Sequence, residues 1–363
     1  MFINIFLFFA SFFHLFLSPI KNNQPTPNVI VVTLDGLRWQ EIFNGADSII
    51  LNDKTYNGDI DLIKKNYWSN DLNERRGNLT PFIWNTIAKS GVLIGNRNFN
   101  ANFNVSNKYQ FSYPGYNEIF TGYADDSVNS NDKIPNKNIN VLEYINGLPS
   151  YKNKVAAFST WDVFPFILNS KRNGLLVNSD VDTLNFKEPT LQLLNEMQLI
   201  AAKPINVRLD VLTYFTAKEY LKAYHPKLLY ISFDETDDFA HSGMYDQYLK
   251  ALHAEDAMLS NLWTTIQSIP QYKNNTTLII TCDHGRGGTG KSTWKNHGQE
   301  IKESSQIWLA AMGPKIKPLG EIKQPVQFYQ NQIASTIGTI FGESFNQSNA
   351  KHPVGMPLSS ILK

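Results

Sequence analysis

The sequence predicts an α/β fold, with a doubly wound, mostly parallel central sheet flanked by helices on both faces. Several short runs of apolar, β-branched residues lack the alternation of a half-exposed strand, which indicates strands buried on both faces. Segments with apolar residues at helical spacing lie between these runs. Strands that alternate with helices are typical of a parallel sheet covered by helices.

The expected strands are apolar runs that end in or near polar residues. They are Asn28–Asp35, Lys154–Ser159, Lys227–Asp234, Thr277–Asp283 and Gln306–Met312.

Three helices are expected between or beside these strands. Thr80 suits an N-cap and Pro81 the first helical position, so a helix is predicted over Pro81–Ser90, with Gly91 as its stop. The longest helical patterns cover Val211–Tyr224 and Tyr245–Ile269.

The chain of 363 residues is long enough for one large α/β domain or two ordinary ones. No internal repeat, low-complexity tract or obvious linker divides it, so a single domain is expected over residues 25–363. The less regular stretches Tyr56–Asn78 and Phe164–Pro204 are interpreted as surface insertions, one of which could cover a site.

Residues 1–20 are expected to be a signal peptide. The apolar run Met1–Ser18 is short for a membrane-spanning helix of roughly 20 residues, and it lies where an export signal belongs. No Lys or Arg precedes it and no clear small-x-small cleavage site closes it, so an uncleaved N-terminal anchor is the alternative. The mature protein is therefore expected to be secreted or periplasmic, without a stable membrane partner unless the N-terminus stays uncleaved.

Charge and cysteine content restrict the possible partners and metal ligands. The 33 Lys and Arg residues nearly balance the 32 Asp and Glu residues, so no strong field would attract a nucleic-acid polymer. Cys282 is the only cysteine, which excludes an intrachain disulfide and a multi-cysteine metal site. Any metal would have to be held by Asp, Glu and His.

Acidic residues and histidines follow three of the expected strands. Asp35 closes the first run, Asp283 and His284 close another, and Asp237 precedes His241 by four residues, which on a helical turn places both on one face. Because ligands bind beyond the carboxyl ends of strands in such sheets, these side chains are site candidates. Surface turns also use Asp freely, so only the recurrence favours a site.

A glycine-rich loop follows Asp283-His284 and leads to His297. Glycines at 285, 287, 288 and 290 allow the loop to bring all three side chains towards one point. The histidines at 225, 253 and 352 lack comparable partners and are expected at caps, helix surfaces or loops, and His14 lies in the signal segment.

Taken together, the motifs resemble the alkaline phosphatase superfamily, and most closely its nucleotide pyrophosphatase/phosphodiesterase branch. They occur in that family's order over residues 28–298: Asp35-Gly36-x-Arg38, Ser112-Tyr113-Pro114 with Thr121-Gly122 nine residues on, Asp237…His241, Asp283-His284-Gly285 and His297-Gly298. Each motif alone is weak, whereas their joint occurrence is specific.

The resemblance implies two divalent metal ions. It places one on Asp35, Ser112, Asp283 and His284, and the other on Asp237, His241 and His297. Oxygen and imidazole ligands with open positions suit catalytic Zn²⁺, and Mn²⁺ is the alternative.

The resemblance also implies an exported hydrolase of small phosphate esters. Ser112 would be the nucleophile, activated by the metals, and the reaction would pass through a phosphoseryl intermediate. Whether the substrate is a phosphomonoester, a phosphodiester or a phosphonate stays open, and Arg38, Arg286 and Lys291 are candidate cations for the extra charge of a monoester.

The chain departs from the resembling family near its nucleophile. The resembling phosphodiesterases usually carry Thr where this chain has Ser112, with an Asn downstream that holds the phosphoryl oxygen. Asn117, Asn131 and Asn136 are all candidates for that role, and Asn100 and Asn102 are no better supported. Tyr113 and Tyr116 could line a pocket, although aromatic residues beside a buried turn more often pack.

Two other functions compete with this interpretation. A sulfatase is suggested by Ser112-Tyr113-Pro114-Gly115-Tyr116, but the Arg of the sulfatase segment is missing and three histidines favour softer ions than Ca²⁺. A nucleotide-binding module is suggested by Gly285–Ser292, which fits a phosphate-loop pattern after a strand, but no helix pattern follows it. A cofactor-independent phosphoglycerate mutase is a further relative, for which the chain is short.

Overall fold

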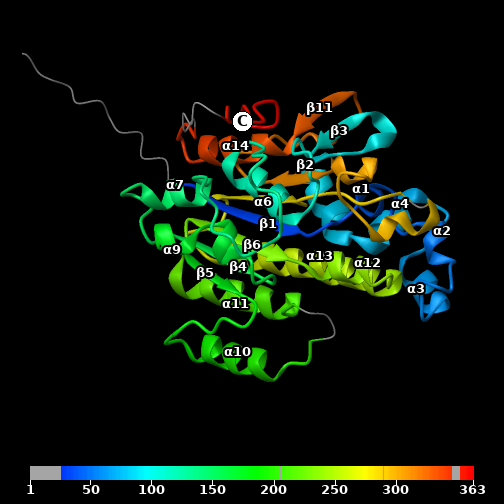
Figure 1. Cartoon of the computed structure of the whole chain (residues 1–363), viewed down its shortest axis with the longest axis horizontal. Coiled ribbons are helices and arrows are strands. Elements are labelled where there is room, and N and C mark those ends of the chain that lie inside the picture. The colour runs from blue at the N-terminus through cyan, green and yellow to red at the C-terminus, as the bar shows by residue number, and fades with distance from the viewer. Residues whose placement is uncertain (1–25, 204–206, 289, 346–351) are drawn as a thin grey trace, which may run out of the picture.

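The structure, a computed structural model, describes residues 26–203, 207–288, 290–345 and 352–363 (Figure 1). The predicted signal peptide lies outside these residues, as do Thr289 and the side chains of Lys291 and Ser292.

An eight-stranded sheet forms the centre of the molecule, in the order β10-β2-β9-β7-β1-β6-β4-β5. All neighbouring strands are parallel except for β9, which runs antiparallel to both β2 and β7. The mostly parallel sheet predicted from sequence is therefore confirmed. The strands of this sheet are β1 (Asn28–Leu34), β2 (Gly91–Ile94), β4 (Val155–Ser159), β5 (Leu176–Ser179), β6 (Leu228–Phe233), β7 (Thr276–Thr281), β9 (Leu309–Met312) and β10 (Gly320–Glu321).

A second, three-stranded sheet has the order β11-β3-β8. Its strands are β3 (Ala101–Asn104), β8 (Gln306–Ile307) and β11 (Val326–Tyr329). The run Gln306–Met312, expected as one strand, is thus divided between the two sheets. Trp308 lies at the break, fully buried, where its indole N–H donates to Leu37 O at 3.1 Å.

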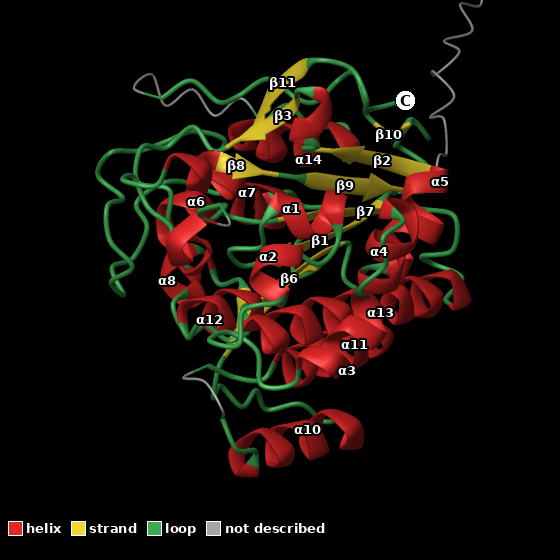
Figure 2. Cartoon of the chain, turned by 90° about the vertical axis from the view of Figure 1, so that its right-hand side faces the viewer, coloured by secondary structure: helices red, strands yellow, loops and turns green. Residues whose placement is uncertain are grey.

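Helices cover both faces of the central sheet, as expected (Figures 1 and 2). The long helices α11 (Asp210–Tyr224) and α13 (Tyr245–Ser268) pack together on one face, while α6 (Ser112–Thr121), α7 (Val141–Gly147) and α14 (Ile333–Ile340) group on the other. α10 (Pro189–Ile200) packs on α11 at the margin of the molecule. The remaining helices are α1 (Trp39–Asn44), α2 (Ser48–Leu51), α3 (Ile60–Tyr67), α4 (Leu72–Leu79), α5 (Ala88–Ser90), α8 (Phe164–Ile167), α9 (Ser170–Asn173) and α12 (Glu235–His241).

The helix expected over Pro81–Ser90 forms, but its middle is wider than an α-helix. Ile83–Ile87 is a π-helix, followed by α5, and Gly91 both ends the helix and begins β2. Asp256 of α13 caps the start of this helix, because its carboxylate accepts hydrogen bonds from Phe82 N at 2.7 Å and Ile83 N at 3.0 Å.

The two expected insertions contain more regular structure than the sequence indicated. Tyr56–Asn78 contains α3 and most of α4, and the described part of Phe164–Pro204 contains α8, α9, β5 and α10. All of these helices except α10 span only four to eight residues, which is too short to give a clear periodic pattern in the sequence.

Candidate active site

Three neighbouring parallel strands place the predicted side chains at one edge of the sheet. Asp35 follows β1, Asp283 and His284 follow β7, and α12, which carries Asp237 and His241, follows β6. Since β1 pairs with both β6 and β7, the carboxyl ends of the three strands meet. Side chains up to 249 positions apart in the chain therefore converge.

The first group, which we term the strand-end cluster, consists of Asp35, Asp283 and His284. All three side chains are buried, and His284 Nε2 lies 3.4 Å from Asp35 Oδ1 and 3.4 Å from Asp283 Oδ2. These two carboxylate oxygens have no hydrogen-bond partner among the described residues. Buried polar atoms are almost always satisfied, so their convergence fits a bound cation.

The ring of His284 is also oriented to bind a cation at this cluster. Its Nδ1 lies 2.9 Å from Gly285 O, and since a carbonyl only accepts, Nδ1 carries the proton. Nε2 then presents a lone pair towards Asp35 and Asp283. A backbone partner on the far ring nitrogen is the usual arrangement for a metal-binding histidine.

Burial and mutual repulsion disturb the ionisation of this cluster. Burial, followed by the charges of Asp283 and Asp237, raises the pKa of Asp35 well above its usual range. Burial likewise raises the pKa of Asp283 to about 8. Burial, reinforced by the neighbouring His297, holds the pKa of His284 well below its usual range. The imidazole is therefore neutral, as a metal ligand must be.

The second group, which we term the helix–loop cluster, consists of Asp237, His241 and His297. His241 Nε2 lies 3.1 Å from Asp237 Oδ2 and 3.0 Å from His297 Nε2. Its members are more open than the strand-end cluster, because the His241 side chain is 43% exposed. Asp237 and His297 also form a possible metal-binding set with His284, whose ring stacks on His297 at 3.9 Å. The two clusters are therefore contiguous.

Arg286 contacts Asp237 through its Nη1 atom. Although burial alone would raise the pKa of Asp237, the Arg286 guanidinium holds it well below its usual range. Burial lowers the pKa of His297 to about 4, so this imidazole is neutral as well. Both groups are thus in the protonation state that binds a cation.

Ser112 is the first residue of α6 and lies beside the strand-end cluster. Its Oγ is 3.4 Å from His284 Nε2. Pro114 occupies the first turn of α6, where a missing N–H costs nothing. Gly115 allows the helix to approach β7, because a Cβ at this position would lie only 2.4 Å from Asp283 O. Ser112 and Asp283 are brought together by that close approach.

Two further residues hold the carboxylates of the strand-end cluster by hydrogen bonds. Tyr116 is fully buried and its hydroxyl donates to Asp35 Oδ2 at 2.8 Å, and Gly36 N donates to Asp283 Oδ1 at 3.1 Å. Each carboxylate therefore keeps one bonded oxygen and one free oxygen. Sequence reasoning treated Tyr116 as a pocket or packing residue, and its position one helical turn after Ser112 was the available signal.

A cavity of about 340 Å³ opens beside Ser112. Its lining includes several acidic residues, a tryptophan and Asn131, and it contains neither arginine, lysine nor histidine among the residues that the structure describes there. The lining residues are Ser112, Asn131, Trp161, Asp162, Asp180, Val207, Asp234, Asp237 and Asp238.

The structure distinguishes between the candidate asparagines. Asn131 lines this cavity, and its Oδ1 accepts a hydrogen bond from Tyr113 N at 2.9 Å. Asn117 is instead buried in an amide network, where its Oδ1 accepts from Asn136 and Asn138 at 3.0 and 3.1 Å. Asn102 lies on β3, where its Oδ1 accepts a hydrogen bond from Arg97, and Asn100 lies just before that strand.

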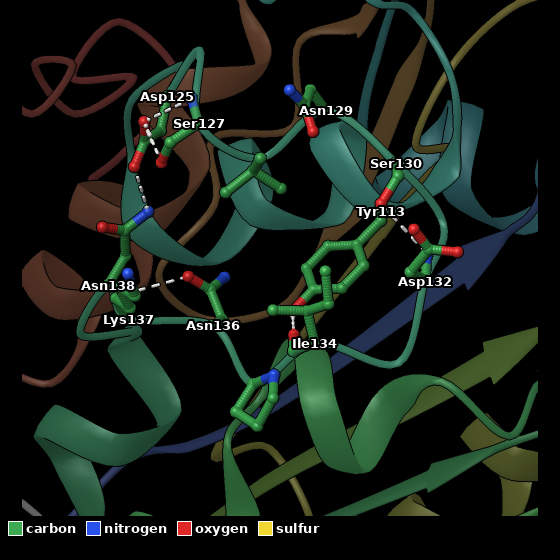
Figure 3. Close-up of a pocket in the computed structure, with 12 residues that line it drawn as sticks. Tyr113, Asp125, Ser127, Asn129, Ser130, Asp132, Ile134, Asn136, Lys137 and Asn138 are labelled. Carbon is green, nitrogen blue, oxygen red and sulfur yellow. Dashed lines mark hydrogen bonds between the residues drawn. The ribbon is translucent and has the colours of Figure 1, made fainter.

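A second, smaller cavity of about 130 Å³ lies under the loop that follows α6 (Figure 3). Tyr113 points into it and donates its hydroxyl to Ile134 O at 2.6 Å. Asn136, Asn138 and Asp125 surround the other side, with Asn138 donating to Asp125 Oδ2 at 2.8 Å. Tyr113 therefore supports this loop rather than lining the cavity beside Ser112.

The candidate cations outside the two clusters are placed differently from the expectation. Arg38 is buried and paired with Glu41, and its Nη1 donates to Gly287 O at 3.2 Å, so it braces the glycine-rich loop. The segment after Gly288 is a 3₁₀-helix, Gly290–Lys295, and not the α-helix that a phosphate loop requires. This local structure contradicts the nucleotide-binding alternative.

The described histidines outside the motifs have structural surroundings, as expected. His225 follows α11 in the left-handed conformation as its C-cap, and His253 Nδ1 lies 3.0 Å from Leu79 O. His352 stacks on Tyr123 at 4.8 Å. Among the described helices, none combines the length and the apolar character needed to cross a bilayer.

The doubly wound sheet, with carboxylates and imidazoles at its strand ends beside a helix-borne serine, defines an alkaline phosphatase-like hydrolase. The chain belongs to the type I phosphodiesterase / nucleotide pyrophosphatase family, which it matches over residues 50–331, and to the alkaline phosphatase superfamily that contains it. It is therefore a phosphoric ester hydrolase. The matched range includes the predicted nucleophile and every predicted metal ligand except Asp35.

Solved structures with this fold are similar over most of the chain. The wild-type alkaline phosphatase PafA has a TM-score of 0.61 at 11% identity, covering 94% of this chain and 100% of its own. The lipoteichoic acid synthase LtaP from Listeria monocytogenes has a TM-score of 0.56 at 13% identity, covering 88% and 73%. A putative sulfatase from Bacteroides thetaiotaomicron has a TM-score of 0.56 at 13% identity, covering 92% and 74%. A search of curated protein sequences finds no match.

Proposed function

We propose that the protein is an exported two-metal phosphodiesterase that acts through a phosphoseryl intermediate on Ser112. The observation that carries this proposal is the position of Ser112 between the strand-end cluster and the 340 Å³ cavity. A substrate in that cavity would meet the serine hydroxyl and Asp237, and the strand-end cluster lies directly beside that serine.

Two divalent cations fit the available ligands. Asp35, Asp283, His284 and Ser112 would hold one, and Asp237, His241 and His297 the other, with zinc favoured and manganese as the alternative. The unpaired oxygens Asp35 Oδ1 and Asp283 Oδ2 support the first site most directly. When bound, the cations supply Lewis acidity that activates the serine hydroxyl and offsets the charge that develops on the phosphoryl group.

The protein's own groups orient the phosphoryl group and bear the covalent bond. A bond forms between Ser112 Oγ and phosphorus as the bond to the leaving alcohol breaks, and a water molecule later cleaves the phosphoseryl bond. Ser112 begins the ten-residue helix α6, whose N-terminus favours negative charge. Because Tyr113 N holds the Asn131 oxygen, the Asn131 amide N–H groups are left to donate to a phosphoryl oxygen.

The lining of the cavity favours a diester over a monoester. A dianionic monoester would face Asp162, Asp180 and Asp238 without an arginine or lysine among the described lining residues. Lys133 and Lys203 lie at the periphery, each 2.5 Å from one carboxylate, Asp162 and Asp180 respectively. These pairs reduce the negative charge but leave no free cation in the lining, so a monoanionic diester fits better.

The test is hydrolysis of three substrates by metal-loaded protein: p-nitrophenyl phosphate, bis-p-nitrophenyl phosphate and p-nitrophenyl sulfate. The proposal expects the diester to be hydrolysed fastest and Ser112→Ala to lose at least about 10³-fold of that activity. Ser90→Ala, a change at the end of α5, is the matched control and should keep full activity. Sulfate preference, or diesterase activity that survives Ser112→Ala, would contradict the mechanism.

The proposal that the protein is exported rests only on the apolar run at residues 1–18. It predicts that protein recovered from outside the cytoplasm of its host begins close to residue 21, which mass spectrometry of the intact chain would show. An intact N-terminus in a membrane fraction would instead support the uncleaved anchor.

A further inference from the structure

Arg286 is a buried cation that has no role in the proposed hydrolysis of a phosphate ester. It lies two residues after His284, is only 1% exposed, and is absent from the lining of the cavity beside Ser112. A buried guanidinium is costly unless its donors are satisfied and its charge is paired. Its contacts therefore indicate what it does.

All three nitrogens of the guanidinium group have partners inside the protein. Nε donates to Trp294 O at 3.0 Å, Nη2 donates to Lys295 O, and Nη1 donates to Asp237 Oδ1. The planar fork of arginine makes such contacts simultaneously, which a lysine cannot do. Arg286 thus joins the residue that begins the helix–loop cluster to the segment that leads to His297.

The segment held by Arg286 is itself firmly anchored. Trp294 is fully buried and packs edge-on against Tyr56 at 5.3 Å and Tyr245 at 5.2 Å. Gly287 N donates to Asn296 O at 3.0 Å, which closes the loop immediately before His297. The position of His297 relative to Asp237 therefore depends on Arg286.

The contact between Arg286 and Asp237 depends on the absence of a side chain at Gly36. Gly36 has φ +57°, and a Cβ there would lie 2.4 Å from Asp237 Oδ1 and 2.6 Å from Arg286 Nη1. Any side chain at position 36 would displace the pair. The turn after β1 is thus shaped to admit both groups.

We propose that Arg286 is a positioning residue that holds Asp237 and the His297 loop in one arrangement, so that the helix–loop cluster can bind its cation. The inference rests on the proposed two-metal site. It differs from a direct contact with the substrate phosphate, because Arg286 acts through Asp237. Its positive charge opposes a cation nearby, and the proposal requires the gain from positioning to exceed this repulsion.

The test is calorimetric titration of the full mature chain, freed of metal, with Zn²⁺, comparing wild type with Arg286→Met and Arg286→Lys. Wild type is expected to bind two equivalents. Arg286→Met should bind the first with unchanged affinity and the second at least about tenfold more weakly, the scale of losing a residue that orients a metal ligand. Arg286→Lys keeps the charge but not the fork, so its second site should also weaken, although less.

Three results would overturn the inference: an unchanged second site in the variants, a tighter second site, or equal weakening of both sites. If Arg286→Met does not fold by circular dichroism, Arg286→Lys decides the matter alone. A wild type that binds fewer than two equivalents would instead contradict the two-metal function. Arg97→Met removes a partly buried arginine that precedes β3 and donates a hydrogen bond to Phe103 O; it is the control and should bind both equivalents as wild type does.

Discussion

The two clusters are contiguous but are built from different kinds of structure. The strand-end cluster stands on β1 and β7, is buried, and has each carboxylate held by one hydrogen bond with the other oxygen free. The helix–loop cluster stands on α12 and on the loop before His297, and its His241 side chain is 43% exposed. Backbone pairing in the sheet positions the first, whereas a side chain, Arg286, positions the second.

Ligands held by the sheet and ligands held by a helix and a loop should differ in how strongly they bind a cation. A site whose ligands are fixed by a sheet loses little conformational entropy when a cation binds, while a site on a short helix and a loop must be ordered by other contacts. We therefore expect the strand-end cluster to bind its cation more tightly and to tolerate substitution less well.

The largest effect is expected for Asp283→Asn in the strand-end cluster. This change removes one charge from the group that faces Ser112, and diesterase activity should fall at least about 10³-fold, the scale on which loss of a catalytic group acts. The first equivalent of Zn²⁺ should be lost in a calorimetric titration. Retention of two equivalents with unchanged affinities by Asp283→Asn would contradict the assignment of Asp283 as a ligand of the tighter site.

A smaller effect is expected for His241→Gln in the helix–loop cluster. Because 43% of the His241 side chain is exposed, the variant should fold with an unchanged thermal midpoint. Zinc should be lost from the second site only, and activity should fall between about tenfold and 100-fold. Loss of both equivalents would contradict the separation of the two clusters. Gln247→Asn on α13 provides a nearby control.

The strand-end cluster was largely predictable from sequence because its residues directly follow apolar runs. Asp35 and Asp283 stand where a buried strand stops, and a parallel sheet brings such ends together whatever the details of packing. The spacing of Asp237 and His241 likewise placed both on one helix. Four strands of the central sheet, β1, β4, β6 and β7, were predicted for the same reason, and the run Gln306–Met312 is interrupted by buried Trp308. The short strands β2, β5 and β10 were not predicted.

The contacts that link the clusters were not predictable from local pattern. Arg286 and Asp237 are 49 positions apart, and nothing in either motif indicates that they touch. The choice of Asn131 over Asn117 and Asn136 depends on the path of the loop after α6, which consists mainly of polar residues without periodicity. Such contacts arise from tertiary packing between segments that are far apart in the sequence.

The smallest effect is expected for Asp256, a carboxylate that is buried but lies outside the two clusters. Asp256 is as buried as the carboxylates of the strand-end cluster, but each of its two oxygens accepts a hydrogen bond from a backbone N–H group. Burial raises the pKa of Asp256 from 3.8 to about 7. Between those values the folded protein holds this proton more tightly than the unfolded chain, so this group's contribution to stability falls as the pH rises.

Asp256→Asn cannot titrate at this position, and the comparison isolates that contribution. In urea unfolding of metal-free protein at pH 5, 6 and 7, the stability of wild type relative to Asp256→Asn should fall by on the order of 1 kcal/mol per pH unit. Titration of the two clusters occurs in both proteins and cancels. A difference that does not change with pH would contradict a burial-raised pKa for Asp256.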